Sequence, residues 1–147
     1  MALIVQKYGG TSVADLDRIR HVAARVAATH AAGHRVAVVV SAMAGETNRL
    51  LGLGKAAAAC PSEREMDALA SSGEQVTAAL TAIVLEGLGV PAQSFLGWQI
   101  PIETDDSFTR ARIRGIDGGR LRAALDDRRI AVVAGFQGIG PTGSITT

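Results

Sequence analysis

The residues best suited to chemistry lie at the start of the chain, where Lys7 precedes Gly9 and Gly10. Glycines let a backbone turn tightly and bring its N–H groups close to an anion, and a lysine beside them adds a compact positive charge. A short apolar run, Ala2–Val5, precedes this loop, and a helical pattern follows it. This order of strand, glycine pair and helix start predicts a phosphate-binding loop, with an ordinary turn and a solvated lysine as the alternative.

The composition gives Lys7 further weight. Of the 15 basic residues, only Lys7 and Lys55 are lysines, and the others are arginines. We interpret the lysine at the loop as a position that requires a compact ammonium and not a planar guanidinium. The loop is not the P-loop pattern, in which the lysine follows the glycines.

The run Lys7–Val13, KYGGTSV, resembles the opening signature of the aspartokinases, within the amino acid kinase family. Further matches follow in the family's order along almost the whole chain. The resemblance implies ATP-dependent phosphorylation of the side-chain carboxylate of L-aspartate to 4-phospho-L-aspartate, the first step of lysine, threonine and methionine biosynthesis. It also implies Mg²⁺ beside ATP, a homo-oligomeric full-length enzyme and a cytoplasmic location.

Bulk composition narrows the function classes. The 147 residues suit one domain, and the apolar and charged fractions of 48% and 20% are those of a globular protein. A net charge of +1 gives no basic field for nucleic acid or membrane, and 3% aromatic residues are too few for a base-stacking surface. Cys60 is the only cysteine, which excludes an intrachain disulfide and fits a reducing compartment. We expect no signal peptide and no membrane-spanning segment.

The first helix is expected directly after the loop. Ser12 and Asp15 have the spacing of a capping box, which predicts a helix that runs to about Ala32 and ends at Gly33. Its buried stripe is expected to contain Leu16, Ile19, Ala23, Val26 and Ala27.

Arg35–Val40 is the predicted second strand, because a continuous β-branched run is typical of a parallel strand covered on both faces. Two strands joined by a helix form a βαβ unit, so their carboxyl ends, at Lys7 and Ser41, should share the sheet edge where ligands bind. Ser41 and Thr47 are therefore expected beside the loop, with a turn or N-cap role as the alternative. The resemblance implies that both line the cleft for nucleotide and substrate.

A long helix is predicted from Ser62 to about Glu86, after a helix over Asn48–Ala59. Its apolar side is expected to consist of Met66, Leu69, Gly73, Val76, Leu80, Ile83 and Gly87. Glu74 lies at the border of that side, where its carboxylate could be solvated or could pair with the ammonium of an amino acid substrate. The resemblance favours the second role, because aspartokinases carry this Ser-Gly-Glu type of turn and its glutamate contacts the bound aspartate.

The remaining chain alternates strands and turns. The predicted elements are a strand at Val90–Leu96, a hairpin of Gln99–Ile102 with Arg112–Ile116, a helix at Asp117–Arg128, a strand at Ile130–Ala134 and a closing hairpin at Ser144–Thr147. Asp105 and Asp106 could form a metal pair, but we interpret them as a solvated turn and assign no metal ligand. The resemblance implies that the loop Gly135–Gly138 lies beside the substrate.

These elements predict an α/β fold with a mainly parallel sheet. The resemblance implies a three-layer α/β/α sandwich of the amino acid kinase or carbamate kinase type. In aspartokinases the closing threonine pair leads into a Gly-Arg-Gly-Gly-Ser-Asp segment, which supplies an arginine for the substrate and an aspartate for catalysis. The C-terminal nucleotide lobe and the regulatory ACT domains come later still. The resemblance thus implies that residues 1–147 are a truncated N-terminal lobe, which should be inactive alone.

Residue roles follow from the loop chemistry and the resemblance together. Lys7 is the catalytic residue, and nucleotide binding is assigned to Lys7, Tyr8, Gly9, Gly10 and Ser41. Substrate binding is assigned to Ser41, Thr47 and Glu74. A carboxylate acceptor is already ionised at neutral pH, so positioning and positive charge must carry the catalysis. The alternatives are a kinase for glutamate, acetylglutamate or a nucleotide monophosphate, and a noncatalytic binding or assembly module.

Overall fold

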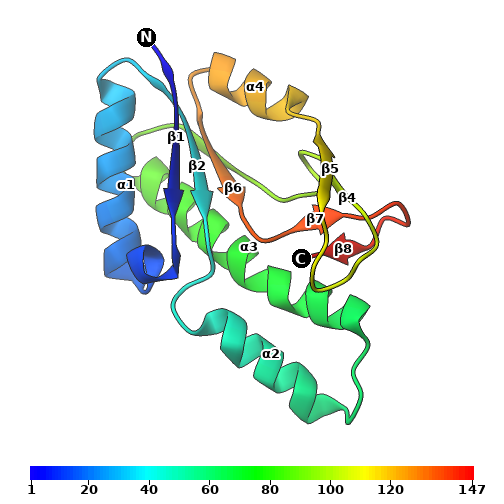
Figure 1. Ribbon diagram of the computed structural model, residues 1–147. Coiled ribbons are helices and arrows are strands. Elements are labelled where there is room, and N and C mark those ends of the chain that lie inside the picture. The colour runs from blue at the N-terminus through cyan, green and yellow to red at the C-terminus, as the bar shows by residue number, and fades with distance from the viewer.

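A four-stranded parallel sheet forms the centre of the computed structural model, which describes residues 1–147 (Figure 1). The strands lie in the order β1-β2-β6-β3, so β1 is at an edge. Their bounds are β1 Leu3–Tyr8, β2 Arg35–Val40, β3 Ala92–Phe95 and β6 Ile130–Ala134. The predictions for β2 and β6 are confirmed to the residue, and β3 is shorter than the predicted span. The two central strands consist almost wholly of valine, isoleucine and alanine because both faces of the sheet are covered.

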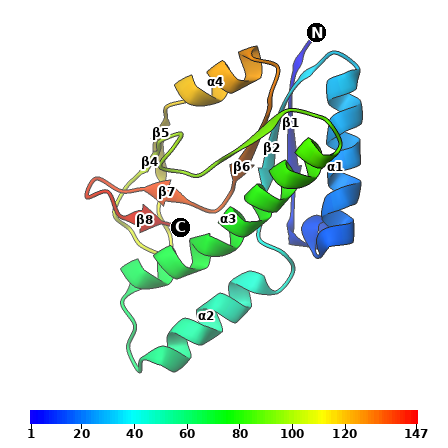
Figure 2. The same ribbon diagram turned by 180° about the vertical axis from the view of Figure 1, so that it is seen from behind.

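Helices cover the two faces of this sheet (Figures 1 and 2). Their bounds are α1 Leu16–Ala31, α2 Glu46–Ala57, α3 Glu63–Gly87 and α4 Gly119–Asp126. α1 and α3 pack on one face, α4 packs on the other, and α2 packs against α3. The predicted three-layer α/β/α sandwich with a mainly parallel sheet is therefore confirmed.

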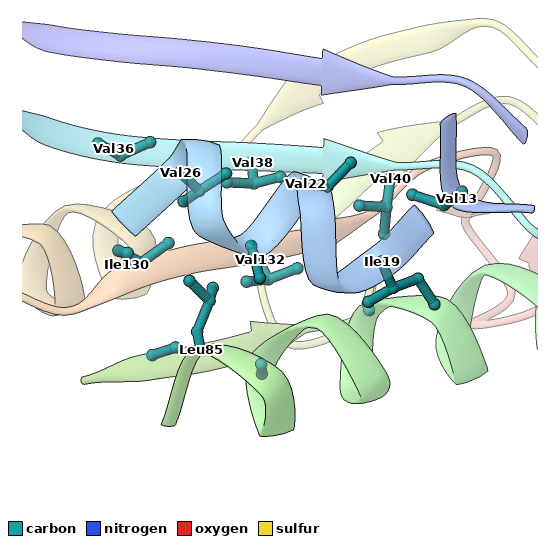
Figure 3. Close-up of a cluster of buried hydrophobic side chains, with 14 of the residues drawn as sticks. Val13, Ile19, Val22, Val26, Val36, Val38, Val40, Leu85, Ile130 and Val132 are labelled. Atoms are coloured by element: carbon teal, nitrogen blue, oxygen red, sulfur yellow. The ribbon is translucent and has the colours of Figure 1, made fainter. Parts of the chain in front are cut away.

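The larger hydrophobic core lies between the sheet and helices α1 and α3 (Figure 3). Val38 and Val132 project into it from the two central strands, and neither is exposed. Ile19 of α1 and Leu85 of α3 meet them from the helical layer, and both are also fully buried. Alternate residues of the same strands face a second, smaller core under α4, as the period of a strand requires.

The start of α1 differs from the prediction. A short 3-10 helix, η1 (Gly10–Val13), follows β1, and Asp15 caps α1 by accepting a hydrogen bond from the Arg18 N–H at 2.8 Å. Ser12 therefore has no capping role. Leu16, expected in the buried stripe, is 41% exposed because the helix has only just begun there. The rest of the predicted stripe is buried or packed against the core, and Gly33 follows the end of the helix as expected.

α3 turns a partly different face to the core than predicted, since Met66 and Gly73 are buried as expected but other members of the predicted side are not. Val76 and Ile83, expected to be buried, are 53% and 61% exposed. The buried face consists largely of small and polar residues, namely Asp67, Ala70, Ser71, Gly73, Glu74, Thr77, Ala78 and Thr81. The hydroxyls of Thr77 and Thr81 donate to backbone carbonyls one turn earlier, which allows them to be buried. Glu74 thus lies inside the protein and not at a border.

By length and composition alone, α3 is apolar enough to cross a membrane. The core helix of a globular domain meets the same two criteria. Half of the most apolar stretch of α3 is buried inside the fold, and the helix packs against α1, β3 and β6. Its apolar character is accounted for by this central position.

A second, smaller sheet lies beyond the carboxyl ends of the central strands, with the order β5-β4-β7-β8. Its strands are β4 Ile102–Thr104, β5 Ile113–Ile116, β7 Gly138–Ile139 and β8 Ile145–Thr146. The predicted hairpin is confirmed as the antiparallel pair β4–β5, although β4 begins later than Gln99. The Asp105 carboxylate accepts hydrogen bonds from the Ser107 and Arg112 amides, so it stabilises the hairpin turn. These bonds hold the pKa of Asp105 below its usual range.

Two truncations on α1 test this account of the core. Ile19→Ala should lower the free energy of unfolding by about 2–5 kcal/mol, because it removes a fully buried side chain and leaves a cavity. Leu16→Ala should cost about 1 kcal/mol or less, because that side chain is largely exposed. Urea denaturation of both variants measures the difference, and equal losses would contradict the assigned face of α1.

Candidate functional site

The carboxyl ends of β1, β2 and β6 meet at one edge of the central sheet, as predicted. The Ser41 N–H donates to the Tyr8 carbonyl at 3.0 Å, and the Gly135 N–H donates to the Val40 carbonyl at 2.9 Å. The backbone pairing therefore continues one residue beyond the ends of β2 and β6. As a result, the three loops that follow these strands begin side by side.

A cavity of about 530 Å³ lies at this edge. The loops after β1 and β2, the start of α2 and the middle of α3 enclose it, and Phe136 of the loop after β6 completes it. Its lining residues are Gly10, Thr11, Ser41, Ala42, Met43, Ala44, Gly45, Thr47, Asn48, Glu74 and Phe136. The structure thus brings together Gly10, Ser41, Thr47 and Glu74 from the predicted site.

Two glycines allow the walls of the cavity to approach each other. A Cβ on Gly10 would lie 3.0 Å from the Ala42 carbonyl oxygen, and a Cβ on Gly73 would lie 2.9 Å from the Ala42 Cβ. Neither distance accommodates a side chain without a shift of the backbone. The loop after β2 is therefore held between η1 on one side and α3 on the other.

Helix α2 directs its N-terminus into the cavity. It begins at Glu46, two residues earlier than predicted, so Thr47 lies in its first turn. Gly45, with φ +78°, precedes this turn and has no side chain to cap it. Uncapped N–H groups and the positive end of the helix dipole favour an anion at this point. Asn48, which sequence reasoning did not single out, lines the cavity in the same turn.

Glu74 is the only acidic side chain that lines the cavity, and it is 3% exposed. Its Oε1 accepts a hydrogen bond from the Ala42 N–H at 3.0 Å, whereas its Oε2 is buried without a partner. Burial raises the pKa of the Glu74 carboxyl, and the bond from Ala42 partly opposes this shift. A buried oxygen without a donor is costly, and an ammonium group would satisfy it with a charge-assisted hydrogen bond.

Three residues of the predicted site do not line this cavity. Lys7 is exposed at the end of β1, and a Cβ on Gly9 would lie 3.8 Å from its Nζ, so the ammonium lies over the loop. None of the ion pairs of the protein includes Lys7. The Tyr8 side chain packs on the α1 side and donates its hydroxyl to Gln6 at 3.0 Å. Burial raises the pKa of this hydroxyl. Because the side chain packs on the α1 side, only the Tyr8 backbone faces the loop.

Phe136 adds an aromatic side chain to the predicted loop Gly135–Gly138. It has a positive φ of 45° and is 53% exposed where it borders the cavity. A left-handed backbone is costly for a bulky residue, and such strained residues cluster at functional sites. No feature of the sequence pattern indicates this conformation.

Residues 1–147 contain no group of three or more His, Cys, Asp or Glu side chains that could hold a metal ion. Mg²⁺ in phosphoryl-transfer sites takes one or two carboxylates together with phosphate oxygens. The cavity offers a single carboxylate, Glu74, and the Ala42 amide already occupies one of its oxygens. These residues do not make a Mg²⁺ site by themselves.

Comparison with known sequences gives a consistent match. A profile of the amino acid kinase family matches residues 2–147. The chain is 53% identical to an aspartokinase of Pseudomonas aeruginosa and 50% identical to an aspartokinase of Thermus thermophilus. Each match covers 100% of this chain and 36% of the relative, so the chain spans about a third of the length of these relatives.

Known structures are similar over the same range. An aspartate kinase from Synechocystis has a TM-score of 0.83 and 40% identity, and the match covers 99% of this chain and 23% of that chain. E. coli aspartokinase III in complex with aspartate and ADP has a TM-score of 0.87 and 26% identity, over 100% of this chain and 43% of that one. A carbamate kinase from Giardia, with a TM-score of 0.73 and 11% identity over 98% and 64% of the two chains, shares the fold alone.

The cost of burying the unpaired Glu74 oxygen should be detectable in the pH dependence of the free energy of unfolding. Since burial raises the folded pKa above the unfolded one, the stability that this carboxyl contributes is complete below the unfolded pKa and is lost as pH rises through the folded pKa. Glu74→Gln lacks this titration. Its free energy of unfolding relative to wild type should therefore increase from about pH 4 to about pH 8 in the absence of ligand.

Urea denaturation at several pH values measures this difference. Glu86→Gln, an exposed glutamate of the same helix, is the matched control and should follow the wild-type profile. Parallel pH profiles for Glu74→Gln and wild type would show that the buried oxygen carries no such cost.

Proposed function

We propose that this chain, which belongs to the amino acid kinase family, forms the acceptor-binding part of an aspartate kinase. The reaction is transfer of the γ-phosphoryl group of ATP to the side-chain carboxylate of L-aspartate. The observation that carries this proposal is the buried Glu74 Oε2, which lacks a donor and borders a cavity at the carboxyl ends of the strands. The match to aspartokinases over the whole chain supports this proposal. The complete reaction is proposed only for a protein as long as these relatives, of which this chain corresponds to about a third.

Charge complementarity assigns the acceptor a position in the cavity. L-Aspartate carries one ammonium and two carboxylates. The ammonium donates to Glu74, which satisfies its free oxygen. The uncapped first turn of α2 and the Ser41 and Thr47 side chains present donors for a carboxylate at the other wall. Both ends of the amino acid are then held, which leaves its reacting carboxylate oriented.

The phosphoryl donor is assigned to the side of the cavity where the loop after β1 lies. One oxygen of the aspartate side-chain carboxylate attacks the γ-phosphorus, and the bond to the β,γ-bridging oxygen breaks to release ADP. No general base is required, since the carboxylate is ionised at neutral pH. Two anions must approach each other, so Lys7 and the backbone N–H groups of Gly9 and Gly10 stabilise the charge on the transferring group.

The role of Glu74 can be tested in a hybrid enzyme, in which residues 1–147 replace the matching third of the Pseudomonas aeruginosa relative. Glu74→Gln should raise the aspartate KM roughly 10- to 100-fold, as expected for loss of a charged hydrogen bond of about 1.5–3 kcal/mol. The ATP KM should change little, because Glu74 does not face the phosphates. Steady-state kinetics with Glu86→Gln as the control checks both constants. An unchanged aspartate KM would exclude the proposed ammonium contact.

The role of Lys7 predicts a different kinetic effect in the same hybrid. Lys7→Ala should lower kcat by about 10²-fold or more, since a charge on the moving phosphoryl group acts mainly in the transition state. Lys7→Arg should restore little activity, because a planar guanidinium does not replace a compact ammonium. Lys55→Ala removes the other lysine and should leave kcat unchanged. If Lys7→Ala keeps near-full activity, with folding confirmed by circular dichroism, the loop after β1 is only a turn and Lys7 has no catalytic role.

A further inference from the structure

Asp67 is a second buried carboxylate on α3, one heptad before Glu74 and on the same face of the helix. It is 1% exposed, and none of the ion pairs of the protein includes it. A charge this deeply buried requires either a cation or several hydrogen bonds. The structure gives it hydrogen bonds only, and all of them come from distant parts of the chain.

Three donors converge on the Asp67 carboxylate. Its Oδ2 accepts from the Thr109 N–H at 2.8 Å and from the Thr147 N–H at 2.9 Å. Its Oδ1 accepts from the Thr147 hydroxyl at 2.6 Å. Thr109 and Thr147 are 42 and 80 residues away in the sequence. One side chain of α3 therefore fixes both the loop between β4 and β5 and the residue after β8; we call these three residues the Asp67 anchor.

The anchor holds a strained residue. Thr109 has a positive φ of 65°, which is rare for a β-branched side chain. Such a conformation persists only where the surrounding structure enforces it. The hydrogen bond from the Thr109 N–H to Asp67 is one such constraint, and it is part-buried, which strengthens it.

The anchor lies next to the substrate cavity. Asp67, Thr109 and Thr147 line a neighbouring cavity of about 510 Å³. Phe136 lines both cavities and so forms the boundary between them. Thr109 and Thr147 therefore line the same cavity as Phe136, so a displacement of either would change the surroundings of the residue that separates the two cavities.

We propose that Asp67 is a positioning residue, which sets the Thr109 loop and Thr147 in the cavity next to the substrate cavity, where Phe136 separates the two. The relatives are nearly three times as long as this chain, so in them further chain follows the position of Thr147. Asp67 fixes the direction in which that chain leaves, relative to Glu74 on the same helix. The kinetic part of this inference rests on the proposed aspartate kinase function.

The geometry distinguishes two substitutions. Asp67→Ala removes every acceptor of the anchor. Asp67→Asn retains one oxygen for the two amides, and its NH₂ group can donate to the Thr147 hydroxyl, which reverses its role. If Asp67 acts by position and not by charge, the asparagine should restore what the alanine removes.

The experiment uses the hybrid enzyme described above, with hydrogen exchange followed by mass spectrometry and with steady-state kinetics. Asp67→Ala should accelerate exchange in peptides that contain Thr109 and Thr147, but not in peptides of β6. It should also lower kcat/KM for aspartate by about 10- to 100-fold with little change in the ATP KM. Asp67→Asn should remain within about 3-fold of wild type in kcat/KM. Asp117→Ala, which removes a carboxylate that accepts from the Gly119 N–H at 2.9 Å, is the matched control and should alter neither readout.

Unchanged local exchange in Asp67→Ala, or accelerated exchange with normal kinetics, would overturn the inference. A general rise in exchange that includes β6 would indicate a structural role only. If Asp67→Ala does not fold, Asp67→Asn decides: normal exchange with a loss of more than about 10-fold in kcat/KM would mean that the charge and not the position matters. A wild-type hybrid that binds but does not phosphorylate aspartate would refute the proposed function, and the exchange measurements would still test the anchor.

Discussion

The site depends on one close contact, in which the loop after β2 lies between two glycines. Gly10 of η1 and Gly73 of α3 both approach Ala42, and the Ala42 N–H holds the Glu74 carboxylate from the inside. If either glycine carried a side chain, the loop after β2 would have to shift, and the Ala42 amide that bonds to Glu74 would shift with it. The strand ends, the start of α2 and the only acidic side chain of the cavity are therefore linked through a single backbone position.

The elements that could be predicted from the sequence are those whose stability depends on local composition. Branched aliphatic runs indicate β2 and β6 to the residue, because strands covered on both faces need apolar residues throughout. The buried face of α3 could not be predicted in this way. It consists largely of small residues and of threonines that bond to their own helix, while Val76 and Ile83 face outward. Hydrophobicity alone identifies Met66 and Gly73 but not the polar and small residues that make up most of the buried face.

The residues of the candidate site also fall into those that local sequence could predict and those that it could not. Ser41, Thr47 and Glu74 could be brought together in advance, since parallel strands end at one edge and the family resemblance indicates the residue types. Asn48 was missed because its position follows from where α2 starts. Phe136 was expected only as part of the loop Gly135–Gly138, and its positive φ could not be predicted. Asp67 was missed because its hydrogen-bond partners, Thr109 and Thr147, lie 42 and 80 residues away in the sequence, and no local pattern predicts such a contact.

The position of β1 at the edge of the sheet gives the two charged residues of the proposed mechanism different mechanical support. β1 is hydrogen-bonded to one neighbouring strand only, and Leu3 and Val5 on its outer side are 49% and 64% exposed. Glu74 belongs to a helix that packs against α1, α2 and three strands of the central sheet. Local opening is easiest where backbone hydrogen bonds are few and exposed. In the proposed mechanism, Lys7 therefore stands on the less constrained strand and Glu74 on the more rigid helix, so that the loop after β1 can adjust to a phosphate while the position of Glu74 stays fixed.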